Sequence, residues 1–484
     1  LTYRYDNVHH QVSHITNAKG ETYQLNYDPD GRLCEEIGFD NVKTTYQHDA
    51  NGHLLEKQEF GNQHAEKPFV TTYQRDPQGR LLVKTLPDGH AVTYQYNAQS
   101  QLVSVEEGAT LLYYEYDPQG RLSGEHQNGH TQRYRYDECG RLIGTLLPDM
   151  QWLEYHYENQ HLSNITLNQQ PLANYRYDPQ QRLSKYHQGN GLINRYAYSQ
   201  HGDKIFHVDH PDTLLWERKH RYSSQGNLQE TTGNEARRYV YDALNRLTEV
   251  DAPGGAAGEN NSETYRWDAA SNPIYDSGHA ENHRTAPGNR LSSFSAKSFE
   301  YDRFGNLISE SQEKHGGVKW VKRYTYDCQH RLIAAEMPDG NVASYTYDAF
   351  NRRLTKTVNG HTTLFIWRGH RLAAQMEGDR ENYRNYIYRP GSFEPLAMTR
   401  HHGFEYDYYL ENRSKDRTLD VKPKPEIYWY QNDRLGTPHS LTNANGQATW
   451  KANYLAFGSV KQDYDSYFSN KNSLNSSAPH QNMG

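Results

Sequence analysis

The chain has few of the residues on which several common protein classes depend. Only 3 of its 484 residues are cysteine, an odd and scattered set that argues against a disulfide scaffold and suits synthesis in a reducing cytoplasm. No stretch of about 20 apolar residues occurs, so no transmembrane helix is predicted. The net charge of −7 provides no overall basic field for nucleic acid. The composition therefore argues against a disulfide-rich domain, a helical membrane protein and a nucleic-acid-binding protein.

Signatures of catalysis and of metal binding are also missing. The sequence has neither a Gly-rich phosphate loop nor a Gly-x-Ser-x-Gly nucleophile elbow, and nothing places two carboxylates at the separation of a glycosidase pair. The 26 histidines are densest at His9-His10-x-x-x-His14 and at His401-His402, without the Cys/His spacing of a zinc site. We therefore predict no enzymatic activity, no cofactor and no metal site.

Apolar residues are scarce, but tyrosine is abundant. Hydrophobic residues make up 35% of the chain, which is low for a globular protein, yet 41 tyrosines give an aromatic content that disordered chains lack. A buried tyrosine ring brings a large apolar area together with a hydroxyl that needs a partner. We therefore expect a thin wall with two partly wet faces and no thick apolar core.

A tyrosine–aspartate pair recurs along most of the chain, followed each time by a turn and a Gly-Arg-Leu-like triplet. The repeat residues of two clear copies are Tyr116, Asp117, Gly120, Arg121 and Leu122, and Tyr136, Asp137, Gly140, Arg141 and Leu142. The pairs at positions 96, 116, 136, 157, 177 and 198 follow one another at steps of 20 or 21 residues. Further copies lie between positions 5 and 76 and between 222 and 348. Self-similarity at such a period predicts a repeat architecture.

In the downstream copies the spacing loosens. The extra length includes the glycine-rich segments 253–258 and 314–317, which we expect in surface loops.

One repeat is predicted to be a pair of strands with two kinds of turn. The aromatic run 112–116 favours a strand, Asp117-Pro118-Gln119-Gly120 has the composition of a β-turn, and 121–126 returns as a second strand. Asn128-Gly129 is the strongest short signal for a two-residue hairpin turn, after which 131–136 begins the next copy. No sustained helical periodicity is present. The predicted fold is all-β, built from consecutive antiparallel β-hairpins.

The number of strands limits the architecture. Roughly 35 strands at about 4.8 Å spacing would form a ribbon on the order of 170 Å long. Open sheets rarely exceed about ten strands, because strand twist accumulates. The ribbon must therefore fold back into stacked sheets, form a solenoid or wrap around a hollow, and we favour a hollow wall.

These residues resemble a known family. Tyr-Arg-Tyr-Asp-Glu-Cys-Gly-Arg-Leu-Ile-Gly at 134–144, and the copies at 116–122 and 241–247, resemble the YD repeats of Rhs proteins, which teneurins and the C component of insecticidal Tc toxins share. The segment 428–438, with Asp433, Leu435, Gly436 and Thr437, resembles the opening of the Rhs C-terminal core, and 450–458 continues it. By this resemblance 1–360 is the YD-repeat shell, 361–460 the end of the repeats with the start of the core, and 461–484 a Ser/Asn-rich tail.

The resemblance implies a long curled sheet that spirals into a cocoon-like shell around a C-terminal toxin domain. It implies manufacture in the bacterial cytoplasm and delivery to a target cell, often by type VI secretion. The implied partners are the enclosed toxin cargo, the remaining N-terminal Rhs segment, and secretion spike or adaptor proteins. The family's self-cleavage motif, Asp-Pro-x-x-Gly, does not occur in this sequence, so we assign no protease residue. We therefore expect a piece of a longer polypeptide or a truncated gene product.

Other interpretations stay open at this point. The repeated arginines could line the path of an anionic ligand, but we expect them to stack on tyrosine rings or to pair with turn aspartates. The repeated aspartates are expected to close turns by bonding to their own backbone. Rows of exposed aromatic rings could instead form a cell-surface or glycan-binding adhesion module. The chain could also be the C component of a Tc toxin.

Overall fold

The computed structural model describes residues 1–198, 204–210, 213–233, 236–252, 262–274, 284–294, 296–313, 319–378, 382–401, 425–433 and 435–465. The predicted glycine-rich loops at 253–258 and 314–317 lie outside the described residues, as do Arg434 of the core motif and the predicted tail from residue 466 onward.

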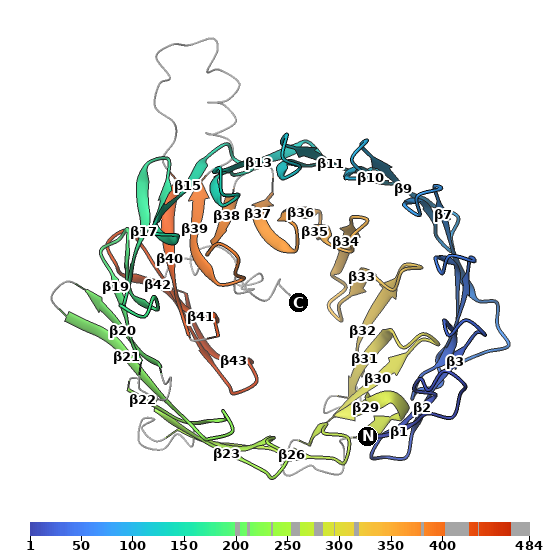
Figure 1. Cartoon of the computed structure of the whole chain (residues 1–484). Coiled ribbons are helices and arrows are strands. Elements are labelled where there is room, and N and C mark those ends of the chain that lie inside the picture. The colour runs from blue at the N-terminus through green and yellow to red at the C-terminus, as the bar shows by residue number, and fades with distance from the viewer. Residues whose placement is uncertain are drawn as a thin grey trace. The chain divides into compact units, whose positions relative to one another are not determined.

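The described residues are almost entirely β-strands joined by short turns, and Figure 1 traces these hairpins in order along the chain. They contain 43 strands, no α-helix and one short 3₁₀ helix, η2 (Pro287–Asn289). The all-β prediction is confirmed. There are more strands than the expected 35 or so, because hairpins continue through the degenerate copies and into the core motif.

The first sheet has 25 strands and uses the first half of the chain. Its strands are β1 (Thr2–Arg4), β2 (His14–Thr16), β3 (Thr22–Tyr27), β4 (Leu33–Ile37), β5 (Lys43–His48), β6 (Leu54–Gly61), β7 (Phe69–Arg75), β8 (Leu81–Thr85), β9 (Ala91–Tyr96), β10 (Leu102–Glu107), β11 (Thr110–Tyr116), β12 (Leu122–Gln127), β13 (His130–Tyr136), β14 (Leu142–Leu146), β15 (Trp152–Glu158), β16 (His161–Leu167), β17 (Gln170–Tyr177), β18 (Leu183–Gln188), β19 (Ile193–Tyr198), β20 (Lys204–His210), β21 (Thr213–Tyr222), β22 (Leu228–Gly233), β23 (Arg237–Tyr241), β24 (Leu247–Asp251) and β25 (Glu263–Thr264).

A two-stranded sheet and a sheet of 16 strands follow. The small sheet contains β26 (Arg266–Trp267) and β27 (Pro273–Ile274). The strands of the large one are β28 (Arg284–Ala286), β29 (Arg290–Phe294), β30 (Lys297–Tyr301), β31 (Leu307–Glu313), β32 (Lys319–Tyr326), β33 (Leu332–Glu336), β34 (Val342–Tyr347), β35 (Arg353–Val358), β36 (His361–Arg368), β37 (Arg371–Glu377), β38 (Asn382–Tyr388), β39 (Pro395–His401), β40 (Glu426–Asn432), β41 (Pro438–Thr442), β42 (Ala448–Tyr454) and β43 (Val460–Asp465). Wherever the register is described in these sheets, each strand pairs antiparallel with the next along the chain.

The predicted repeat unit appears with its expected elements. The runs 112–116, 121–126 and 131–136 correspond to β11, β12 and β13 within one or two residues. Asn128 and Gly129 both have positive φ, at 46° and 88°, which is the conformation that a two-residue hairpin turn requires. These local predictions are confirmed.

The chain divides into two compact units, and each combines an early segment, from the 25-stranded sheet, with a late segment, from the sequence after it. Unit 1 comprises Leu1–Arg121, Glu125–Gly129 and Tyr265–Leu364. Its apolar cluster is small and consists of Leu86, Val92, Val105 and Leu112, with Cys328 and Ala349 of the late segment packed against it. Unit 1 therefore matches the expected thin construction.

Unit 2 comprises Leu122–Gly124, His130–Thr264 and Phe365–Gly484, and it has two larger apolar clusters. The first lies between β14–β18 and the late strands β38–β40, and it includes Leu153, Ile165, Leu172, Ile387 and Trp429. The second is formed by the late strands and includes Phe365, Tyr386, Tyr430, Leu441 and Trp450.

Late strands of unit 2 are buried on both faces. In β38, Ile387 belongs to the first cluster while Tyr386 and Tyr388 belong to the second, as the alternation of side chains along a strand requires. The prediction of a thin wall without an apolar core is therefore wrong for unit 2. The physical reason is local: the runs 364–367 and 372–374 are continuously apolar, which suits strands covered on both sides. Among the described residues, no helix has the length and apolar character needed to cross a membrane.

Candidate functional site: the repeat turns and the seam

The aspartate of each clear repeat organises a turn. In the copy that starts at Tyr116, one oxygen of Asp117 accepts the backbone N–H of Gln119 at 3.0 Å and that of Arg121 at 2.9 Å. The N–H of Gly120 donates to the carbonyl of Asp117 at 2.9 Å, and Gly120 has φ of +81°, which glycine adopts without strain. The predicted turn, with an aspartate bonded to its own backbone, is confirmed.

The arginine of the triplet is used twice. Its Nε donates to the second oxygen of the same aspartate, at 2.6 Å for Arg121 with Asp117 and for Arg141 with Asp137. Its guanidinium also lies over the tyrosine of the following copy, at 4.8 Å from the ring centre for Arg141 over Tyr157. Arg80, Arg182 and Arg331 lie over tyrosine rings in the same way. These arginines therefore fasten turns and stack on rings, as predicted.

The tyrosine links each copy to the one before it. The hydroxyl of Tyr116 donates to the carbonyl of Leu102 at 2.8 Å, and that of Tyr136 donates to Leu122 at 2.9 Å. The hydroxyl of Tyr157 donates to Leu142 at 3.1 Å, and later copies repeat the bond. Burial raises the pKa of Tyr116, which keeps its hydroxyl protonated as a donor. The ten predicted repeat residues therefore have structural roles: they close the turns and bond each copy to the one before it.

Removing one of these tyrosine hydroxyl bonds should lower the stability of the fold measurably. We expect Tyr116→Phe to lower the free energy of unfolding by about 0.5–1.5 kcal/mol, because the carbonyl of Leu102 loses its donor in a partly buried site. Urea unfolding is the measurement. Tyr113→Phe on the same strand is the control, since Tyr113 is 43% exposed and its hydroxyl has no described partner. Equal losses in the two variants would show that the hydroxyl bond contributes nothing.

The turn aspartates should also make the fold sensitive to acid. The N–H and guanidinium of Arg246 hold the pKa of Asp242 below its usual range, and Arg32 lowers the pKa of Asp28 in the same way. At Asp268, burial opposes ionisation, but Lys19 and Asn272 outweigh it and bring the pKa to about 2.

A carboxylate whose pKa is lowered by folding stabilises the fold above its unfolded value of about 3.9 and loses that contribution as the pH falls. We therefore expect the urea midpoint to fall steadily from about pH 4 to about pH 2. A variant with Asp117, Asp137 and Asp178 all changed to Asn should show a shallower fall. A midpoint that rises on acidification would contradict this origin.

The core motif proves to contain one more copy of the repeat turn. An oxygen of Asp433 accepts the N–H of Leu435 at 2.8 Å and that of Thr437 at 2.9 Å, and the N–H of Gly436 donates to the carbonyl of Asp433. The hydroxyl of Tyr454 donates to the carbonyl of Pro438 at 2.8 Å, as the repeat tyrosines do to leucine carbonyls. The shared Asp-x-x-Gly spacing was a signal for this relation that the sequence interpretation missed.

This copy differs in how its aspartate is held. Thr437 stands where the repeats have arginine, and His439 Nε2 lies 3.6 Å from the Asp433 carboxylate instead. Burial opposes ionisation of Asp433, but the bonds from His439 and from the Thr437 N–H outweigh it and lower its pKa. The side chain of Leu435 is 89% exposed. The four predicted core residues therefore form a turn.

Contacts between the early and late segments within one unit form what we call the seam. In unit 1 it contains Glu59, Lys84, Glu107 and Glu125 of the early segment, and His330, Gln329, Arg331 and Arg352 of the late segment. Arg331 is held between its own turn aspartate, Asp327, at 2.6 Å and Glu107 at 2.8 Å. The late segment thus contributes repeat turns, so the same arginine closes a turn and joins two parts of the chain.

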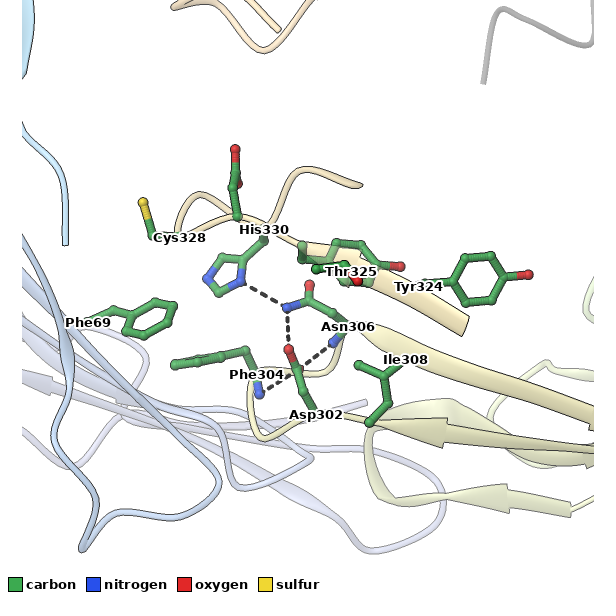
Figure 2. Close-up of a pocket in the computed structure, with 11 residues that line it drawn as sticks. Phe69, Asp302, Phe304, Asn306, Ile308, Tyr324, Thr325, Cys328 and His330 are labelled. Carbon is green, nitrogen blue, oxygen red and sulfur yellow. Dashed lines mark hydrogen bonds between the residues drawn. The ribbon is translucent and has the colours of Figure 1, made fainter. Parts of the chain in front are cut away.

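Aromatic rings line a shallow hollow at this seam. Figure 2 shows Phe69 of the early segment facing Phe304 and His330 of the late segment. The hollow that these residues help to line has a volume of about 250 Å³. The ring centres of Phe69 and Phe304 are 4.5 Å apart. Asn306 Nδ2 donates to Asp302 at 2.8 Å and lies 3.0 Å from His330 Nδ1, while Asp302 also accepts the N–H groups of Phe304 and Asn306. Because these polar groups satisfy one another, the hollow joins segments and does not resemble a catalytic cleft.

The seam of unit 2 is apolar at its centre and amide-rich beside it. Trp429 packs in the first apolar cluster, and its Nε1 donates to the carbonyl of Leu172 at 2.9 Å. Nearby, the amide of Gln431 donates to Gln188 at 2.8 Å, and that of Asn190 donates to Thr442 at 3.0 Å. The partners in these pairs are 243 to 257 residues apart in the sequence.

A buried carboxylate completes this seam. Asp149 is 3% exposed and accepts hydrogen bonds from Gln151 and from Asn385 of β38. Nε2 of His401 lies 3.0 Å from the same carboxylate, and its ring stacks on Tyr383. The neighbouring His402 lies outside the described residues. In the part of the chain that the structure describes, no three His, Cys, Asp or Glu side chains converge as a metal site would require.

Family comparisons agree with this architecture. The model described as "Teneurin YD-shell" matches residues 1–123 and 219–374, which is more than half of the chain. The "RHS Repeat" model matches residues 116–149, and the "RHS protein" model matches residues 427–464, where the Asp433 turn lies. The protein is therefore of the YD-repeat shell class. The chain belongs to the Rhs and teneurin YD-shell family.

Individual relatives carry toxin names. The chain is 28% identical over 519 residues to "Double-stranded DNA deaminase toxin A" of Burkholderia cenocepacia, covering 94% of this chain and 35% of that protein. It is 27% identical over 286 residues to "Toxin protein Tse5" of Pseudomonas aeruginosa, covering 49% of this chain and 21% of that protein. The chain thus spans about a third or less of these relatives.

Among solved structures, TcdB2–TccC3 without its hypervariable C-terminal region matches 96% of this chain and 32% of that chain. The TM-score is 0.50 at 12% identity, so this likeness concerns the fold alone.

Proposed function

We propose that this chain forms part of a non-catalytic shell that encloses the C-terminal toxin domain of a bacterial Rhs protein. The wall keeps the toxin away from its targets by exclusion, so the chain needs no active site of its own. The same proposal includes manufacture in the bacterial cytoplasm and delivery into a target cell, with type VI secretion as the route. The partners are the toxin cargo, the N-terminal Rhs segment and a secretion spike or adaptor protein.

The observation that carries this proposal is the seam. In both units the ribbon returns after about 190 to 260 residues and closes against an earlier part of itself. In unit 1 Glu59 and Glu107 contact His330 and Arg331 of one repeat turn of the late segment, and Glu125 contacts Arg352 of the next turn. A barrier needs such sealing between successive passes of the ribbon, whereas a flat adhesive sheet does not. The toxin names of the relatives support the proposal.

Protease protection of the cargo tests the proposal. The polypeptide encoded by the complete gene is purified and treated with protease, and survival of the cargo is followed by mass spectrometry. We expect protected cargo in the native protein and rapid cleavage when the seam is opened by Asp348→Ala together with Trp429→Ala. Leu435→Ala, on the exposed core turn, is the matched control and should protect as the native protein does. Cargo cleaved as fast in the native protein as when free, or a gene that encodes no cargo, would overturn the proposal.

A further inference from the structure

Three basic residues lie side by side across the strands β17, β18 and β19 of unit 2, which Figure 1 shows in the teal to green part of the ribbon. Arg176 is directly opposite Lys185, and Lys185 is directly opposite Arg195. We call these three residues the basic row. Side chains alternate along a strand, and Tyr175 and Tyr186 on these strands point into the first apolar cluster. The basic row therefore lies on the opposite face of the sheet from β38–β40.

The arrangement is electrostatically unfavourable in the isolated chain. Neighbouring strands are about 4.8 Å apart, and like charges directly opposite one another destabilise a sheet. Arg176 and Arg195 are exposed and Lys185 is half-buried. Within the described residues, neither Arg176 nor Lys185 has a carboxylate at ion-pair distance. Burial lowers the pKa of the adjacent His187, and the charges of Lys185, Arg176 and Arg195 lower it further. All three basic residues therefore act electrostatically on the same imidazole.

The same register position in a later copy of this sheet carries alternating charge. Arg221 is opposite Glu230, which is opposite Arg238 on the following strand. Glu230 forms ion pairs with both arginines, at 3.1 Å and 3.5 Å. Among the other described copies, Asn26 faces Glu35, Gln47 faces Glu56 and Thr346 faces Thr355. The basic row therefore does not follow from the repeat, and an acid at position 185 would fit the sheet better.

We propose that the basic row is a docking site for a short acidic segment of a partner protein. Carboxylates laid across these strands would neutralise Arg176 and Lys185, which lie directly opposite one another. Anionic membranes attract clusters of about four to eight basic residues, more than this row offers, and the net charge of −7 repels extended polyanions such as DNA at longer range. The short basic row on one face of an acidic chain instead matches a few carboxylates on a peptide.

Fluorescence anisotropy with a labelled oligoglutamate peptide tests the site on the purified chain at low and high salt. We expect salt-sensitive binding that Arg176→Gln with Lys185→Gln weakens about tenfold. Arg221→Gln with Arg238→Gln is the control and should bind as the native chain does, because that row already contains Glu230. Equal affinity in the two double variants, or no binding to the native chain, would overturn the proposal.

A second variant separates loss of binding from loss of folding. Lys185→Glu recreates the alternating pattern of the control row, so we expect it to abolish peptide binding while raising the thermal midpoint of the chain. Lost binding with a lowered midpoint would show that Lys185 is a structural residue and would contradict the proposal. Polyphosphate and vesicles of anionic lipid serve as alternative probes. Binding of either through the row, without binding of oligoglutamate, would also overturn it.

Discussion

Trp429→Ala is expected to lower the free energy of unfolding by about 3–5 kcal/mol. The indole is 4% exposed and packs between the early and late segments of unit 2. Its Nε1 also donates to the carbonyl of Leu172, which the truncation would leave buried without its donor. The cavity and the unpaired carbonyl both lower the free energy of unfolding.

Chemical denaturation followed by circular dichroism measures this loss. Trp429→Phe should cost less, because it removes the hydrogen bond but keeps much of the buried ring. Leu435→Ala, at a side chain that is 89% exposed, should change stability by no more than about 0.5 kcal/mol. If Trp429→Ala were as mild as Leu435→Ala, the first apolar cluster would not hold the two segments together.

Asp348→Ala is the second large effect, at about 3–5 kcal/mol, because it removes one partner of a buried ion pair. Asp348 is completely buried at the seam of unit 1 and accepts the Nε of Arg352 at 2.6 Å. It also accepts the N–H groups of Phe350 and Arg352. Arg352 would lose this close contact, and Glu125 of the early segment lies farther from it, at 3.5 Å.

The repeat itself supplies the control for this variant. Asp137 closes an identical turn with Arg141, but the two side chains are 20% and 37% exposed, so water can replace the lost contacts. Asp137→Ala should therefore destabilise the protein much less than Asp348→Ala when both are measured by denaturant unfolding. Similar losses would mean that the seam adds nothing to the energy of a repeat turn.

The local structure could be predicted because its signals are local. Asp117, Gly120 and Arg121 lie within five residues of one another, and their turn follows from backbone preference and short side-chain bonds. The pair Asn128-Gly129 fixed a hairpin in the same way. The Tyr116 hydroxyl bond to Leu102 was not predicted, although its regular spacing of 14 or 15 residues follows from the repeat.

The seam could not be predicted from one sequence. Glu107 and Arg331 are 224 residues apart, and no sequence pattern links the two positions. The burial of β38 on both faces was likewise missed, because an overall hydrophobic content of 35% hides the apolar runs near residues 365 and 373. The basic row requires the strand register, since Arg176, Lys185 and Arg195 are evenly spaced in sequence among many other charges.

Electron cryo-microscopy of the polypeptide encoded by the complete gene tests the encapsulation proposal most directly. We expect one continuous strand ribbon, sealed where Glu107 meets Arg331 and where Trp429 meets Leu172, with density for the cargo on its inner side. Cargo density outside the ribbon, or a ribbon that encloses no space, would contradict the proposal.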